Sequence, residues 1–92
     1  MAFVYRVHAI ERMFQRNISE DEVENVVRFG ETIETYLDDK PYASYLILGH
    51  VDNRAVHVVY AKDENDTAII ITVYEPTLEK WHEDFKVRRE KK

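Results

Sequence analysis

The chain has 92 residues, of which 45% are hydrophobic and 34% are charged, and it contains only two glycines and two prolines. This composition is typical of one ordered globular domain and excludes a low-complexity segment. The absence of cysteine excludes a disulfide framework and a thiolate metal site. The apolar runs are far shorter than a membrane span, and the opening residues are too few and too polar for a signal peptide, so we expect a cytoplasmic protein.

The net charge is −5 at pH 7, but the charges are unevenly distributed along the chain. Residues 1–18 carry three arginines against one glutamate, and residues 86–92 carry five bases against one acid. Residues 19–39 are strongly acidic. The overall balance argues against broad affinity for nucleic acid, because that affinity grows with each phosphate neutralised. A local basic surface would suit a single phosphate; alternatively, the acids are a solvated face and the tail is disordered.

An extended segment is expected over residues 3–7, where large apolar side chains alternate with their neighbours. A helix follows from His8, and its core-facing side is predicted to carry Ile10, Met13 and Phe14. We expect this helix to be the first layer over the sheet.

A second helix is marked by a capping box, in which Ser19 precedes Glu22 by three residues. Ile18 is positioned to pack on Val23 as a hydrophobic staple, and Gly30 is positioned to end the helix. The buried side is predicted to carry Val23, Val26 and Val27.

Four strands are predicted next, with no helix between them: residues 31–37, 43–51, 54–62 and 67–75. Short turns join them, which favours an antiparallel sheet. Pro76 ends the last strand, and a short helix or turn near Trp81 leads to a basic tail. We therefore predict an α+β domain over residues 1–85, with two N-terminal helices packed on a four-stranded antiparallel sheet, and a tail over residues 86–92.

The turns predict which side chains share a face of the sheet. A two-residue loop after Val51 sets His57 opposite Leu48, and a four-residue loop after Lys62 sets His57 opposite Thr72. One face then carries the polar residues His50, His57, Thr72 and Tyr74. The other face, which we expect the helices to cover, carries Ile47, Val56, Val58, Tyr60, Ile69, Ile71 and Val73.

The most informative motif is a stripe on the first helix, where His8, Arg12 and Arg16 recur every four residues and so lie along one side. An arginine fork can grip phosphate oxygens, and histidine transfers protons near neutral pH. Cleaving RNA without a metal needs a base for the 2′-hydroxyl, an acid for the leaving 5′-oxygen and fixed positive charge. We hypothesise that His8 and His57 share the proton transfers. The full set of candidate catalytic residues is His8, Arg12, His57, Thr72 and Tyr74, and the candidate phosphate- or RNA-binding residues are Arg16, Arg88 and Arg89.

Each candidate also has a purely structural explanation. His8 can cap its helix, and the two arginines of the stripe can form weak surface ion pairs with nearby glutamates. His57 lies in a valine-rich strand, where a hydrogen-bonded core histidine is equally expected. Threonine and tyrosine are common in strands for packing alone. A metal site is disfavoured, because His50 and His57 have no third ligand at a convincing spacing.

Three segments together carry a family resemblance: His8-Ala-x-x-Arg12-Met-x-x-Arg16 followed by Ile18-Ser19, then Val56-His-Val-Val-Tyr-Ala61, then Ile71-Thr-Val-Tyr-Glu-Pro76 ahead of Trp81. This pattern resembles a domain-of-unknown-function family that opens with a His-Ala-x-x-Arg helix and is grouped with RelE/ParE-type and BrnT-type toxins of bacterial toxin–antitoxin pairs. The resemblance covers nearly the whole chain. It implies a RelE-like fold and metal-independent ribonuclease activity, although such toxins are usually basic and this chain is acidic.

We therefore expect a metal-independent endoribonuclease toxin that uses general acid/base catalysis and needs no cofactor. The expected partners are RNA, a cognate antitoxin protein and a second copy of the chain, with no membrane. The alternative is a non-catalytic protein- or RNA-binding module that has a degenerate toxin fold.

Overall fold

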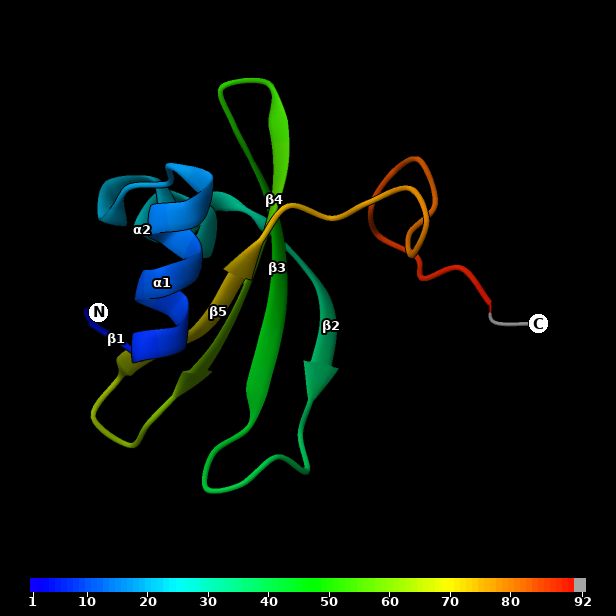
Figure 1. Cartoon of the computed structure of the whole chain (residues 1–92). Coiled ribbons are helices and arrows are strands. Elements are labelled where there is room, and N and C mark those ends of the chain that lie inside the picture. Colours follow the sequence, from blue (N-terminus) through cyan, green and yellow to red (C-terminus); the bar gives the residue numbers. More distant parts are fainter. Residues whose placement is uncertain (91–92) are drawn as a thin grey trace.

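The computed structural model describes residues 1–90, and over that range the chain forms two helices and one five-stranded sheet (Figure 1). The elements in chain order are β1 (Ala2–Tyr5), α1 (Val7–Arg16), α2 (Glu20–Phe29), β2 (Glu31–Tyr36), β3 (Ser44–Val51), β4 (Arg54–Lys62) and β5 (Thr67–Tyr74). The strand order across the sheet is β1-β5-β4-β3-β2. Within the described range, no helix is long and apolar enough to cross a membrane.

The predicted four-stranded antiparallel sheet is wrong, because β1 adds a fifth strand that runs parallel to β5. The pairing runs from Ala2 opposite Thr67 to Tyr5 opposite Ile70. The sequence indicated that this segment is extended but not what it pairs with. The pairing is possible because the antiparallel hairpins use only one edge of β5. The remaining edge offers unpaired backbone groups to the N-terminal segment.

Of the three residues predicted to face the core on helix α1, only Met13 is buried. The buried residues of this helix are Ala9 and Met13, whereas Ile10 is half exposed and Phe14 is 88% exposed. Ala9, which sequence analysis did not place on the core-facing side, is fully buried and belongs to the core cluster. The helix ends at Asn17, whose left-handed backbone conformation is one that asparagine tolerates.

Helix α2 begins as predicted. The amide of Glu22 donates to the Ser19 hydroxyl at 3.1 Å, and the Glu22 carboxylate accepts from the Ser19 amide at 2.8 Å. Val23 and Val26 are buried, and Val26 lies directly over Gly49 of β3. A β-carbon on Gly49 would lie 2.7 Å from a Val26 methyl group, so the glycine permits this close helix–sheet contact.

The register of the sheet is only partly the predicted one. The loop at Asp52 and Asn53 pairs Leu48 with His57, as expected. In the next hairpin, Lys62 pairs with Ala68, one residue beyond the expected Thr67. An irregularity between Val59 and Tyr60 adds a second residue, so His57 pairs with Tyr74 rather than Thr72. The predicted pairing of His57 with Thr72 is therefore wrong by two residues. Successive side chains of a strand point to opposite faces, so a shift of two residues leaves Thr72 and Tyr74 on the same face as His57, as predicted.

The one-residue shift at the start of this hairpin changes which β5 residues face the helices. Ala68 and Ile70 are fully buried in the core under α1 and α2, and Ile69 and Ile71 are only partly buried. The prediction of Ile69 and Ile71 on the helix-covered face is therefore wrong. Val73 does belong to that core, because it lies beyond the irregularity.

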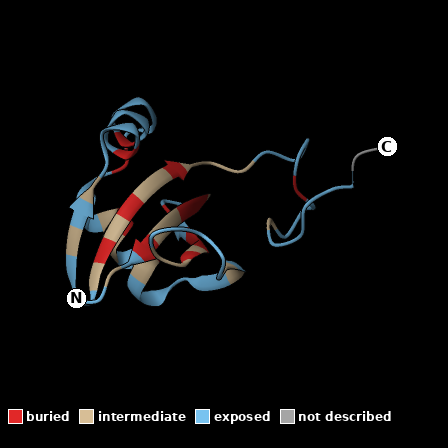
Figure 2. Ribbon diagram, turned by 90° about the horizontal axis from the view of Figure 1, so that it is seen from below, coloured by how far each residue is buried: buried red, intermediate tan, exposed pale blue. Residues whose placement is uncertain are grey.

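The C-terminal segment, defined here as residues 75–90, extends to the side of the sheet away from the helices (Figures 1 and 2), and its Trp81 packs against His57 of β4. Of the helix or turn predicted near Trp81, the segment forms turns, and a β-bridge joins Trp81 to Arg88. Ion pairs anchor it to β2: Lys86 lies 2.9 Å from Glu31, and Arg88 lies 3.1 Å from Glu34. The predicted tail is thus described up to Glu90, and residues 91–92 lie outside the described residues.

Candidate functional site

A groove of about 520 Å³ lies beside the outer end of β5, between α1 and the C-terminal segment. It forms there because β1 pairs with β5 only as far as Ile70, so the edge of β5 beyond that residue carries no neighbouring strand. Side chains of α1 and of the opposite face of the sheet therefore reach the same space. The groove is lined by His8, Arg12, Thr72, Tyr74, Glu75, Pro76, Thr77, Glu79, Lys80, Trp81 and Arg88.

Four of the five predicted catalytic residues line this groove together: His8, Arg12, Thr72 and Tyr74. His8 is exposed and does not cap its helix, since the N-cap is Arg6 and makes no side-chain cap bond. Arg12 is also exposed, and its guanidinium donates to the Gln15 side chain at 3.3 Å. Among residues 1–90, no carboxylate lies within ion-pairing distance of Arg12. Both side chains are therefore available to a ligand.

His57 does not line the groove. It is fully buried, packed edge-on against Trp81 with 4.5 Å between ring centroids. Its Nδ1 lies 3.2 Å from the Tyr74 hydroxyl, and its Nε2 lies 2.8 Å from the Phe85 carbonyl oxygen. The structure therefore puts His57 behind Tyr74, where direct contact with a substrate is blocked. His57 is the hydrogen-bonded core histidine that the structural explanation describes.

Burial determines the ionisation states of His57 and Tyr74. Removal from water lowers the pKa of His57, although its hydrogen bond to the Phe85 carbonyl acts in the opposite direction. Removal from water also raises the pKa of Tyr74 above its ordinary value. Near neutral pH, the imidazole and the phenol are therefore both uncharged.

The charged residues of the groove nearly balance. Glu75 pairs with Arg54 at 3.5 Å, and Arg88 is held by Glu34 while its guanidinium lies 4.5 Å from the centre of the Trp81 ring. Among the remaining charged lining residues, Arg12 and Lys80 are positive and Glu79 is negative, so the groove carries a modest positive excess. Sequence reasoning missed Lys80 and Glu79. In the sequence, Pro76 indicated where the last strand ends, but it did not indicate that the residues after it line a groove beside that strand.

The other predicted binding residues lie elsewhere. Arg16 is exposed on α1 but does not line the groove, and its backbone carbonyl accepts a hydrogen bond from Arg54 at 2.7 Å. The Arg89 guanidinium donates to the carbonyl oxygens of Leu78 and Trp81, which holds the C-terminal segment together. Of the three predicted binding arginines, Arg88 alone lines the groove.

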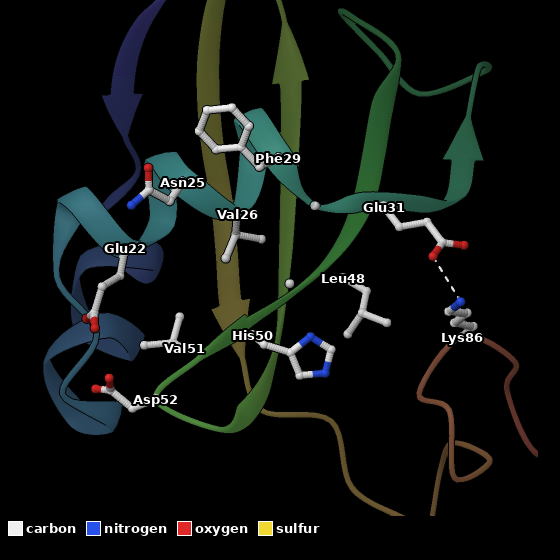
Figure 3. Close-up of a pocket in the computed structure, with 12 residues that line it drawn as sticks. Glu22, Asn25, Val26, Phe29, Glu31, Leu48, His50, Val51, Asp52 and Lys86 are labelled. Carbon is white, nitrogen blue, oxygen red and sulfur yellow. Dashed lines mark ion pairs between the residues drawn. The ribbon is translucent and has the colours of Figure 1, made fainter.

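A second hollow, of about 610 Å³, lies between α2 and the end of the β3–β4 hairpin (Figure 3). His50 lines it rather than joining His57, and the Glu31–Lys86 ion pair closes one side. It contains none of the predicted catalytic or binding residues. Over the described range, no three histidine, aspartate or glutamate side chains gather closely enough to hold a metal ion.

Comparison with known proteins gives one match. No curated protein and no solved structure is significantly similar to the chain. The match is to the family described as "Domain of unknown function (DUF4258)", over residues 5–75, which is well over half of the chain and includes His8, Arg12, Thr72 and Tyr74. It ends before most of the C-terminal segment that closes the groove. The chain therefore belongs to the DUF4258 family.

Proposed function

We propose that the groove binds a phosphodiester of RNA and that the protein is a metal-independent endoribonuclease. The observation that supports this proposal is that His8, Arg12, Thr72 and Tyr74 line one groove, although they come from a helix and a strand more than 50 residues apart in sequence. The groove is small and only modestly positive, which suits one phosphate rather than a long polyanion.

In this proposal each residue has a distinct task. The Arg12 guanidinium holds the non-bridging phosphate oxygens and offsets the negative charge that develops during cleavage. His8, the one imidazole lining the groove, carries one of the two proton transfers, and solvent in the open groove carries the other. Thr72 orients the phosphate, and Tyr74 contacts the ribose. In the reaction the 2′-oxygen bonds to phosphorus, the bond to the 5′-oxygen breaks, and the proton lost from the 2′-hydroxyl is balanced by one gained at the 5′-oxygen.

The biological role that fits this activity is a toxin of a toxin–antitoxin pair, acting on cytoplasmic RNA and restrained by a cognate antitoxin. The support is the resemblance of the helix motif and the strand motifs to RelE/ParE-type and BrnT-type toxins.

One observation favours a second candidate, a non-catalytic RNA- or protein-binding module. Because His57 is buried, the groove presents a single imidazole rather than the acid and base pair that efficient cleavage uses. A module of this kind would bind the same phosphate without cleaving it.

The test is cleavage of a 5′-labelled single-stranded RNA by the purified protein in excess EDTA. We expect cleavage by the wild type and at least about a 100-fold lower rate for His8→Ala and for Arg12→Ala. Arg16→Ala is the matched control, since Arg16 is an exposed arginine on the same helix that does not line the groove. If the wild type binds the RNA but leaves it intact, the binding module is the correct function. If Arg16→Ala impairs cleavage as much as Arg12→Ala, the groove is not the site.

A further inference from the structure

A chain of hydrogen bonds links the C-terminal segment to the groove through two side chains. The Phe85 carbonyl oxygen can only accept a hydrogen bond, so the nitrogen 2.8 Å away from it, Nε2 of His57, must carry a proton. The assignment of this proton therefore follows from the chemistry of the partner.

The surroundings of His57 also determine whether its other ring nitrogen, Nδ1, carries a proton. His57 is fully buried, and no carboxylate among the described residues makes a hydrogen bond to it. A buried imidazole without such a partner is neutral, so Nδ1 is an acceptor. The Tyr74 hydroxyl, 3.2 Å away, donates its proton to Nδ1.

This arrangement fixes the hydrogen-bonding character of Tyr74. A tyrosine hydroxyl has a single proton and two lone pairs. With that proton committed to His57, Tyr74 can act toward a ligand only as an acceptor. The cationic residues of the groove, Arg12, Lys80 and Arg88, are donors, so Tyr74 contributes a different kind of contact.

We propose that Tyr74 is a specificity-determining residue, which accepts a hydrogen bond from a ligand hydroxyl beside the bound phosphate and thereby selects ribonucleotides over 2′-deoxyribonucleotides. A phosphate oxygen has no proton to donate to Tyr74, whereas the ribose 2′-hydroxyl does. The inference rests on the proposed function, in that it needs a phosphate in the groove. It does not need cleavage.

The first experiment reads the protons directly. Nitrogen-15 NMR of the wild-type protein at pH 7 is expected to show His57 protonated at Nε2 and unprotonated at Nδ1. A proton at Nδ1 would overturn the inference, because Tyr74 would then be free to donate into the groove. This measurement involves no ligand, so its result is independent of the proposed function.

The second experiment measures binding of uridine 3′-monophosphate and of its 2′-deoxy counterpart, neither of which can be cleaved. We expect the wild type to prefer the ribonucleotide by about fivefold, which corresponds to one neutral hydrogen bond. Tyr74→Phe should abolish that preference while leaving the affinity for the deoxynucleotide unchanged. Tyr60→Phe is the matched control, because Tyr60 is a partly buried tyrosine on β4 outside the groove.

The outcomes separate this inference from the proposed function. Equal affinity of the wild type for the two nucleotides, or an unchanged preference in Tyr74→Phe, overturns the inference and leaves the phosphate site intact. Failure of the wild type to bind either nucleotide at millimolar concentration overturns both. Loss of preference in Tyr60→Phe also overturns the inference, since the effect would then not belong to Tyr74.

Discussion

The carbonyl oxygen of Phe85 lies 2.8 Å from Nε2 of His57, so a residue of the C-terminal segment completes the hydrogen bonding of a side chain in the middle of β4. Trp81 covers the same imidazole and is itself only 2% exposed. The segment is therefore part of the folded domain. The interior on this side of the sheet depends on its staying attached.

Trp81→Ala is expected to be strongly destabilising. The substitution removes a buried aromatic ring that packs on His57 and lies beneath the Arg88 guanidinium, and it opens a cavity on the second face of the sheet. The free energy of unfolding should fall by about 3–5 kcal/mol. Chemical denaturation followed by circular dichroism measures this loss. Leu78→Ala, in the same segment but more than half exposed, should change stability by less than about 0.5 kcal/mol. Equal losses in the two variants would show that the ring is not buried as described.

His57 should make folding stability depend on pH between 7 and 5. Because burial lowers its pKa in the folded state below the unfolded value of 6.5, the unfolded chain binds more protons as the pH falls through 6.5. Stability is therefore retained above pH 6.5 and lost on acidification, by up to about 1.4 kcal/mol per pH unit. The Arg88 charge acts in the same direction as burial, and Glu34 opposes it. Urea denaturation at pH 7 and pH 5 provides the measurement.

The matched comparison uses two histidine variants. His57→Gln should lower stability at pH 7 but flatten the pH dependence. His50→Gln, which alters an exposed histidine, should keep the wild-type dependence. A pH dependence unchanged by His57→Gln would contradict the assignment.

Gly49→Ala should destabilise the protein by about 1–3 kcal/mol, because the added methyl group would meet Val26 at 2.7 Å. The double variant with Val26→Ala provides a sharper measurement, since shortening Val26 removes the atoms that clash. We expect Gly49→Ala to cost less in the Val26→Ala background than in the wild type, as measured by thermal or urea unfolding. Strict additivity of the two changes would argue against the close helix–sheet contact.

The sequence predicted those features of the fold that depend on local signals. The Ser19 and Glu22 capping box and the tight loop at Asp52 set a helix start and a strand register, because each is determined by a few neighbouring residues. The partner of β1 was not predictable in the same way. Nothing in Ala2–Tyr5 itself distinguishes a parallel pairing with β5 from an unpaired extended segment.

In the candidate site too, features set by local sequence patterns were predictable and those set by distant contacts were not. The stripe spacing correctly indicated that His8 and Arg12 lie on one side of a helix, and strand alternation indicated that Thr72 and Tyr74 share a face. The burial of His57 was not predictable, because it depends on contacts with Trp81 and Phe85, which follow the last strand in sequence. Arg16 continues the stripe in sequence, but only His8 and Arg12 of the stripe line the groove.

The pairing of β1 with β5 has a consequence for biosynthesis. Ala2 is synthesised 65 positions before its partner Thr67, so β1 cannot pair with β5 until the residues between them have been made. The groove needs still later residues, including Trp81 and Arg88. During translation, His8 and Arg12 therefore lack the groove in which they could act until Trp81 and Arg88 have been synthesised, and any activity at this site begins only after that point.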